Sequence, residues 1–310
     1  MAAKPLKISI VMPTKNAAAF VGTALSSVVN QTWRNRQLVL IDGGSADATL
    51  EIARRSLTEA DILHVQADRS ATEAVNRGVA MSDGDIICLL MSDDWLDHAT
   101  LESFATTFAA DPKADLVCGV AKQWLDEGGL PVLENTILPV EGKALDWSRL
   151  LGTPYMAAYA FRRRTWDAVG GFLPAYRYGA DRDFLVRCRL QGLHANVASA
   201  AVYNYRRHAG SATLSEDEQV VRDFLGDHRL MASEWLRSPL LPEDERVVIS
   251  AWRKGETVAL IDRQVSRGSY SSVLHLLLKD ALRYPSSSLK NARRVARHIV
   301  GRWKRRASPG

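Results

Sequence analysis

Short apolar runs alternate with amphipathic stretches through the first hundred residues of the chain. The runs short enough for buried strands, each followed by a polar or glycine-containing turn, are residues 8–12, 37–41, 62–65 and 86–91. The stretches between them with apolar side chains at helical spacing are residues 20–29, 48–57 and 71–80. This alternation predicts an α/β fold with a mostly parallel sheet flanked by helices on both faces.

The pattern is less regular beyond residue 114. Residues 115–122 and 196–205 fit strands, and residues 165–169 and 181–190 fit helices. From about residue 214 the pattern is helical to the end, with breaks at prolines. We therefore expect one domain over residues 1–213 and a helical C-terminal region over residues 214–310.

Three polar clusters follow predicted strands. They are Thr14–Asn16, Asp42–Ser45 and Ser92–Asp94. The carboxyl ends of parallel strands meet at one edge of a sheet, and ligands of such folds bind there. The sequence therefore predicts a binding site built from these three loops.

Charge is unevenly distributed along the chain. The net charge is +5, but residues 281–310 contribute nine Lys or Arg and no acid, which leaves −4 on residues 1–280. A mildly acidic body argues against a nucleic-acid-binding face. Three widely spaced cysteines, with no apolar leader and no membrane-length apolar run, favour a cytoplasmic protein.

The basic tail at residues 289–306 also has an apolar stripe. Val295, Ile299 and Trp303 are spaced for one face of a helix. Such a helix is typical of contact with an anionic membrane surface, here as a peripheral protein on the inner face of the plasma membrane. The alternative is a solvated, frayed chain end.

Several motifs, in this order and spacing, resemble those of family 2 glycosyltransferases. The matching segments are Ser9–Asn16, Gln31–Trp33, Leu38–Thr49, Asn76–Gly78, Gly84–Ile87, Ser92–Asp94, Gly170–Phe172 and Ala180–Asp183. The resemblance covers roughly residues 5–212. It implies a GT-A type fold whose donor half spans about 5–120 and whose acceptor half spans about 121–213.

The resemblance also implies an activity. It implies a hexosyltransferase-type enzyme that moves a sugar, with inversion, from a nucleotide-diphosphate donor, chiefly a UDP-sugar, to a hydroxyl of a glycan or lipid-linked acceptor. Bacterial surface-polysaccharide synthesis is the expected setting. No Gln-x-x-Arg-Trp motif follows residue 183, which favours transfer of a single sugar over processive polymerisation. The alternative is a non-catalytic sugar-nucleotide-binding or assembly protein on the same fold.

Donor-binding candidates lie in the loops that follow the strands. Asp42 is suited to accept an N–H of the base, or it caps the following glycine–serine turn instead. The other candidates for contact with the base, ribose or phosphates are Pro13, Thr14, Asn16, Asn76, Arg77, Ser92 and Arg206. For Asn76 and Arg77, the alternatives are an ordinary polar helix position and a solvated side chain.

Asp93 is the main candidate for a metal ligand. Mg²⁺ or Mn²⁺ binds carboxylate and phosphate oxygens and would neutralise a departing diphosphate. The family's motif is usually Asp-x-Asp, but Met91 occupies the first acidic position here. The resemblance implies that His208, after a later strand, is a second metal or diphosphate ligand, and the alternative is a structural histidine. The alternative reading of this segment is a helix over Trp95–Ala105 capped by Asp94.

Asp181 is the candidate catalytic base. Displacement at an anomeric carbon requires a group that takes the proton of the acceptor hydroxyl. Asp181 matches the second acid of the family's Glu-Asp motif, while Ala180 replaces the first. The alternative for Asp181 is a helix N-terminal carboxylate favoured by the helix dipole.

Overall fold

The computed structural model describes most of the chain. The described residues are 5–67, 70–152, 156–211 and 217–266, with the short segments 273–274, 277–278, 292–293 and 295–296. The chain divides into two compact units, Met1–Asp217 and Glu218–Gly310. The sequence predicts a boundary between residues 213 and 214.

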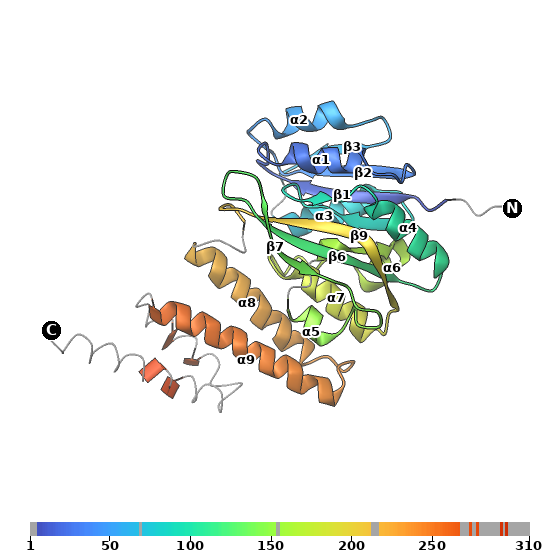
Figure 1. Ribbon diagram of the computed structural model, residues 1–310. Helices are drawn as coiled ribbons and strands as arrows, with labels where there is room; N and C mark the ends of the chain where they lie inside the picture. The colour runs from blue at the N-terminus through green and yellow to red at the C-terminus, as the bar shows by residue number, and fades with distance from the viewer. Residues whose placement is uncertain are drawn as a thin grey trace. The chain divides into compact units, whose positions relative to one another are not determined.

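The first four strands along the chain form the parallel part of a nine-stranded sheet (Figure 1). They are β1 (Ile8–Thr14), β2 (Arg36–Asp42), β3 (Ile62–Val65) and β4 (Ile86–Leu89), in the order β3-β2-β1-β4. β1 and β4 are buried at every position, and β2 is buried at all but its first. Uninterrupted apolar runs of this kind are typical of parallel strands covered on both faces.

The second half of the sheet is mixed. The strands are β5 (Trp95–Leu96), β6 (Leu116–Leu125), β7 (Val132–Ile137), β8 (Tyr159–Arg162) and β9 (Ala195–Arg207). The sheet continues from β4 through β8, β6 and β9 to β5, and β7 pairs with the outer part of β6. β6 and β9 are parallel, while β5, β7 and β8 pair antiparallel with their neighbours. The predicted α/β fold class is confirmed.

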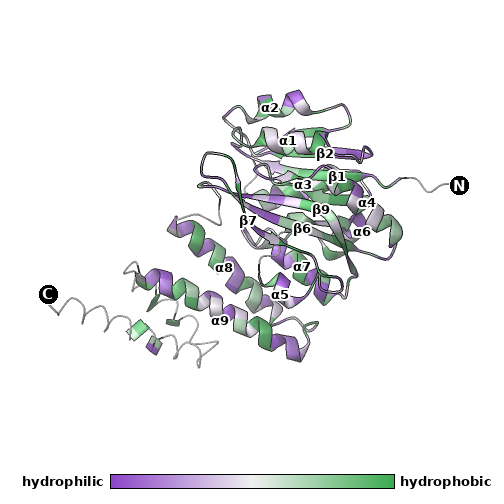
Figure 2. Cartoon of the chain, in the orientation of Figure 1, coloured by the Kyte–Doolittle hydropathy of each residue, from purple (hydrophilic) through white to green (hydrophobic). Residues whose placement is uncertain are grey.

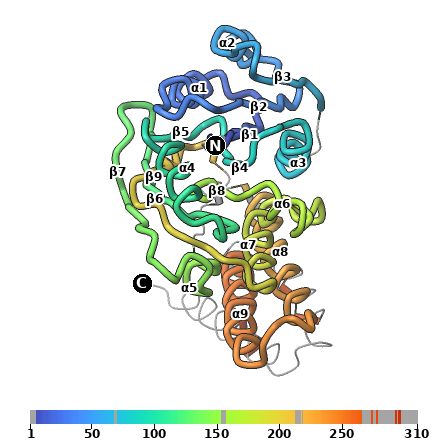
Figure 3. The backbone as a smooth tube through the Cα atoms, turned by 90° about the vertical axis from the view of Figure 1, so that its right-hand side faces the viewer, coloured from blue at the N-terminus to red at the C-terminus, as the bar shows by residue number. Residues whose placement is uncertain are grey.

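Helices cover both faces of the parallel strands, and α1 and α3 lie on opposite sides of β1 and β2 (Figure 3). The helices of this unit are α1 (Val21–Val29), α2 (Thr49–Ser56), α3 (Ala71–Met81), α4 (Thr100–Ala110), α5 (Trp147–Leu150), α6 (Arg163–Val169) and α7 (Ala180–Leu190), with a 3₁₀ turn η1 (Met156–Ala158). Gly78 lets α3 approach the sheet closely, because a Cβ there would lie 2.4 Å from Val11 Cγ1.

The predicted helix over Trp95–Ala105 is wrong at its start. Trp95 and Leu96 instead form β5, which pairs with Asn204 and Tyr203 of β9. The helix begins only at Thr100, and Ala99 rather than Asp94 stands at its N-cap. Pairing with a strand that is distant in the sequence thus replaces the local helical pattern.

The second unit contains α8 (Glu218–Trp235) and α9 (Glu243–Ser266), which pack against each other. α9 shows both hydrophobic and hydrophilic colours along its length (Figure 2), as an amphipathic helix does. Stacked Trp235 and Trp252 join the two helices, with ring centroids 5.8 Å apart. Val295 is buried in a cluster with Leu260, Ile261, Val265 and Val273. Ile299 and Trp303 of the predicted stripe lie outside the described residues.

No helix in the described part of the chain is both long and apolar enough to cross a membrane.

Candidate active site

The loops that follow β1, β2 and β4 lie at one edge of the sheet. Thr14 is opposite Asp42 in the β1–β2 ladder. The Gly43 N–H donates to the Thr14 carbonyl at 2.8 Å, which joins the two loops. β4 pairs with the other side of β1, so Asp93 follows a strand adjacent to the same ladder. The three predicted polar clusters therefore form one continuous edge.

Asp42 is fully buried and organises the turn that follows it. Its Oδ1 accepts the N–H groups of Gly44 at 2.9 Å and Ser45 at 2.7 Å, and its Oδ2 accepts the Ser45 hydroxyl at 2.6 Å. Asn16 ties this turn to the loop after β1, since its Oδ1 accepts the Ala46 N–H at 2.9 Å. The structure thus displays the capping alternative for Asp42, and its donor-binding role stays a prediction.

Thr14 presents a polar group that the fold leaves unused. Its hydroxyl is buried at the end of β1, and no described atom forms a hydrogen bond with it. Buried hydroxyls normally have a partner, so an unpartnered one at a strand end favours a bound ligand. Pro13, directly before it, is buried within β1.

Asp93 and His208 lie together although they are far apart in the sequence. Asp93 Oδ2 is 3.2 Å from His208 Nε2. Their side chains are 32% and 16% exposed, so both reach solvent at the sheet edge. The Phe20 ring packs against the His208 imidazole, with centroids 4.4 Å apart. The two predicted metal ligands therefore form one polar pair. Ser92, which precedes Asp93 in the sequence, is partly buried.

Asp94 points away from this pair and into the protein. Its side chain is fully buried, where Oδ2 contacts the Tyr203 hydroxyl and Oδ1 accepts the Arg206 N–H at 2.7 Å. Burial raises the pKa of the Asp94 carboxyl well above its ordinary value of 3.8, and the charge of Asp93 raises it further. Asp94 is a structural residue that fastens the loop after β4 to β9.

Replacing Asp94 should therefore change how stability depends on pH. Because the folded carboxyl keeps its proton to a higher pH than the unfolded one, the wild type loses stability as pH rises from about 4 toward the raised folded pKa. We expect Asp94→Asn to remove this loss, so that its free energy of unfolding stays level between pH 4 and pH 8 and matches or exceeds that of the wild type at pH 7. Urea unfolding between pH 4 and pH 8 measures this. A variant whose deficit grows with pH would contradict the assignment.

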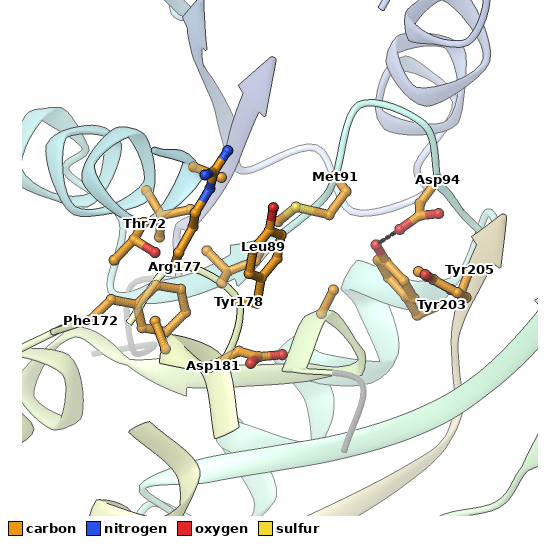
Figure 4. Close-up of a pocket in the computed structure, with 14 residues that line it drawn as sticks. Thr72, Leu89, Met91, Asp94, Phe172, Arg177, Tyr178, Asp181, Tyr203 and Tyr205 are labelled. Carbon is orange, nitrogen blue, oxygen red and sulfur yellow. Dashed lines mark hydrogen bonds between the residues drawn. The ribbon is translucent and has the colours of Figure 1, made fainter. Parts of the chain in front are cut away.

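Asp181 lines a cavity of about 250 Å³ next to the strand end that carries Asp93. The cavity is also lined by Met91 and Asp94, from the same loop as Asp93. The aromatic residues Phe172, Tyr178, Tyr203 and Tyr205 line it as well. Figure 4 shows the Asp181 carboxylate and the Met91 side chain on opposite sides of this cavity. Asp181 Oδ1 accepts the Arg182 N–H at 2.7 Å in the first turn of α7. Its carboxylate thus lies at a helix N-terminus, which favours negative charge.

Asn76 holds the glycine turn beside this cavity. Its Nδ2 donates to the Phe172 carbonyl at 2.8 Å, and its Oδ1 accepts the Phe172 N–H at 3.0 Å. Gly170 and Gly171 adopt positive φ angles of 86° and 65°, which favour glycine. On the other side, Arg187 donates to the carbonyls of Val169 and Gly171. Asn76 is thus occupied by the protein, and its predicted contact with the donor remains untested.

We expect Asn76→Ala to destabilise the protein by about 2 kcal/mol, because each of the two hydrogen bonds to Phe172 contributes about 1 kcal/mol. Urea unfolding of the purified chain measures the loss. Asn35→Ala is the matched control, since Asn35 makes an exposed side-chain bond to the Pro5 carbonyl. A loss no larger than that of the control would show that the glycine turn does not depend on Asn76.

Two further candidates, Arg77 and Arg206, remain to be placed. Arg77 lines a separate open hollow on α3 with His64 and Glu73. Arg206 is only 7% exposed, and its guanidinium contacts protein groups rather than the open edge.

The strand edge can be tested for its fit to a divalent cation. No group of three or more His, Cys, Asp or Glu suited to a metal lies within the described residues. Asp93 and His208 do offer a carboxylate oxygen and an imidazole nitrogen close together at a solvent-accessible edge. Mg²⁺ and Mn²⁺ sites in nucleotide enzymes commonly use one or two protein ligands and complete the shell with phosphates and water. The pair therefore fits a cation that is bound mainly with its nucleotide.

A family model described as Glycosyl transferase family 2 matches residues 9–167, just over half of the chain. The chain belongs to glycosyl transferase family 2. A PGL/p-HBAD biosynthesis glycosyltransferase of Mycobacterium bovis is 32% identical over 221 residues, which are 69% of this chain and 82% of that protein. Membership of the family and this relative show that the chain is a glycosyltransferase, and the non-catalytic alternative loses its support.

Solved structures share the fold of this family member. Staphylococcus aureus TarS 1–349 aligns with a TM-score of 0.63 and 18% identity over 96% of this chain and 92% of that chain. The same protein solved with UDP-GlcNAc gives 0.60 and 19% over 84% and 73%. The mannosyltransferase PcManGT of Pyrobaculum calidifontis, solved with GDP-Man and Mn²⁺, gives 0.57 and 16% over 96% and 87%.

Some residues of the candidate site have no signal in the sequence. Tyr203 contacts Asp94 and lines the cavity, but in the sequence it is one aromatic residue in an apolar strand. Arg187 supports the glycine turn from α7, where its spacing predicts only a pair with Asp183. Both functions arise from contacts between distant segments.

Proposed function

We propose that this family member is an inverting glycosyltransferase that moves one sugar from a nucleotide-diphosphate donor, most simply a UDP-sugar, to a hydroxyl of a glycan or lipid-linked acceptor. Surface-polysaccharide synthesis is the proposed setting. One observation carries the proposal: Asp181 lines the same cavity as Met91 and Asp94, which belong to the loop after β4 that also contains Asp93. The Asp181 carboxylate, which is suited to act as a base, thus lies across one cavity from the loop after β4, which is proposed to bind the diphosphate.

Asp181 has the catalytic role in this proposal. The acceptor oxygen attacks the anomeric carbon while the bond from that carbon to the diphosphate oxygen breaks, and Asp181 takes the hydroxyl proton. Attack from the face opposite the leaving group inverts the anomeric configuration. The apolar and aromatic walls of the cavity would exclude water, which otherwise competes with the acceptor.

The donor lies along the edge formed by the loops after β1, β2 and β4. The unpartnered Thr14 hydroxyl faces the nucleoside in this arrangement, with Pro13, Asn16 and Asp42 forming the walls of its site. Asp93 and His208 face the diphosphate and would hold Mg²⁺ or Mn²⁺. Such an ion supplies Lewis-acid neutralisation of the leaving group when bound.

Two fold neighbours support the donor class without fixing the base. One was solved with UDP-GlcNAc and the other with GDP-Man and Mn²⁺. A panel of UDP- and GDP-sugars, tested by thermal unfolding with and without Mn²⁺, decides between bases. A ligand at 100 times its dissociation constant stabilises the folded state by about 2.7 kcal/mol. Product analysis by NMR then reads the anomeric configuration, and retention would overturn the proposed mechanism.

The basic tail at residues 289–306 is proposed to hold this enzyme at the inner face of the plasma membrane. Its cationic residues suit anionic headgroups. Burial of Val295 in the second unit removes one residue from the apolar stripe, so electrostatic attraction dominates the proposed contact. Sedimentation with phosphatidylserine-containing vesicles, but not with neutral vesicles, is the expected result, and equal binding to both would contradict it.

A further inference from the structure

The Arg206 side chain is enclosed by the protein. It is 7% exposed. Its Nε donates to the Asp93 main-chain carbonyl at 2.9 Å, and its Nη1 pairs with Asp126 Oδ2 at 2.5 Å. Its guanidinium lies 5.0 Å from the ring centroids of both Phe20 and Trp95. A guanidinium bonded in its plane and packed against two aromatic rings is poorly placed to bind a phosphate as well.

These contacts join the segments that form the Asp93–His208 pair. Arg206 holds Asp93 through its carbonyl, which fixes the backbone from which that carboxylate projects. Phe20, which packs beside Arg206, also packs against the His208 ring. The Arg206 N–H is itself held by Asp94. The positions of Asp93 and His208 therefore both depend on the Arg206 side chain, directly for Asp93 and through Phe20 for His208.

Asp126 anchors the other end of this arrangement. It lies just after β6, and its side chain is 10% exposed. Its Oδ1 accepts the Gly128 N–H at 3.0 Å, and its own N–H donates to the Arg207 carbonyl at 2.8 Å. The backbone hydrogen bond from Gly128 and the bond from Arg206 lower the pKa of the Asp126 carboxyl, so it stays ionised near neutral pH.

We propose that Arg206 is a positioning residue that fixes Asp93 and His208 and does not contact the donor. This replaces the prediction that Arg206 binds the diphosphate. The inference rests on the proposed function for its meaning in catalysis, but the arrangement itself can be tested without a substrate. If Arg206 bound phosphate directly, its replacement would weaken nucleotide binding in the absence of metal. If Arg206 only positions Asp93 and His208, metal-free nucleotide binding should not change.

Calorimetry with UDP and Mn²⁺ separates these two roles in the full chain. We expect Arg206→Met and Asp126→Asn to leave metal-free UDP affinity within about twofold of wild type. Both should weaken Mn²⁺ binding to the UDP-saturated protein by roughly 10- to 100-fold, as loss of groups that orient ligands does. The Mn²⁺ affinity of UDP-saturated Arg206→Lys should lie between that of these two variants and that of the wild type. Arg207→Ala is the matched control, because Arg207 pairs with the partly exposed Glu134.

A fall of about tenfold or more in metal-free UDP affinity for Arg206→Met, with none for Asp126→Asn, would overturn the proposal in favour of direct phosphate binding. NMR of the His208 ring gives a reading that needs no nucleotide. We expect its ¹H and ¹⁵N signals to shift in Arg206→Lys and Asp126→Asn but not in Arg207→Ala. Unchanged His208 signals in both Arg206→Lys and Asp126→Asn would also overturn the proposal that Arg206 is a positioning residue. Failure of wild type to bind any nucleotide, with the NMR result intact, would refute the proposed function instead.

Discussion

Asp181→Asn should reduce sugar transfer by roughly 1,000-fold, because general base catalysis typically contributes 100- to 10,000-fold. The amide keeps the shape of the side chain and can still accept the Arg182 N–H, but it cannot take a proton from the acceptor. Initial rates of transfer with the donor found in the nucleotide-sugar panel measure the effect. Nucleotide binding should be unchanged, since Asp181 is proposed to face the acceptor.

The matched control for this variant is Asp167→Asn, which removes the same charge from an exposed position on α6. Full activity in the control and loss in Asp181→Asn would separate a local chemical role from a general charge effect. If Asp181→Asn instead retained more than a tenth of wild-type transfer, another group would have to act as base. An equal loss of nucleotide affinity would place Asp181 on the donor side of the cavity.

Asp93→Asn should have the second largest effect, a fall of about 100-fold in transfer. That corresponds to about 2.7 kcal/mol of transition-state stabilisation, within the several kcal/mol that metal-assisted charge neutralisation supplies. The amide keeps a contact with His208 but loses the negative charge that suits a hard cation. Because Met91 supplies no second carboxylate, we also expect Mn²⁺ binding by the nucleotide-bound variant to become undetectable by calorimetry.

Asp83→Asn serves as the control, because Asp83 is an exposed carboxylate near the opposite end of β4 and pairs with Lys7. Exposed ion pairs contribute little to stability, so this variant should behave as wild type. Persistence of wild-type Mn²⁺ affinity in Asp93→Asn would contradict the assignment of Asp93 as the principal protein ligand.

Most of the parallel part of the fold could be predicted from the sequence because three of its four strands are almost wholly buried. β1, β2 and β4 are mainly apolar, and a polar loop follows each of them. β7 has no comparable signal, since it is almost wholly exposed and is held by pairing with β6. β5 is two residues long, and its conformation depends on β9 more than a hundred residues later.

For the candidate site, the sequence likewise predicts the residues at strand ends but not the contacts between distant segments. The position of a polar residue at or shortly after the end of a buried strand, such as Thr14 or Asp93, could be predicted because the apolar run marks where the strand ends. The partners of Asn76 and Arg206 could not, because a side chain's contacts across the fold leave no local pattern. Asn76 bonds to Phe172, 96 residues away, and Arg206 to the Asp93 carbonyl, 113 residues away.

The long strand β9 has a consequence for how the enzyme is made. It is the last strand of the described sheet to be synthesised. Its residues Tyr203 and Arg206, and His208 directly after it, contact residues 93 and 94. Domains generally fold as units, and β9 belongs to the same compact unit as the first four strands. The Asp93–His208 contact can therefore form only after residue 208 has been synthesised. A nascent chain that ends before β9 would lack the pair proposed to face the diphosphate, so we expect the enzyme to become active only late in its synthesis.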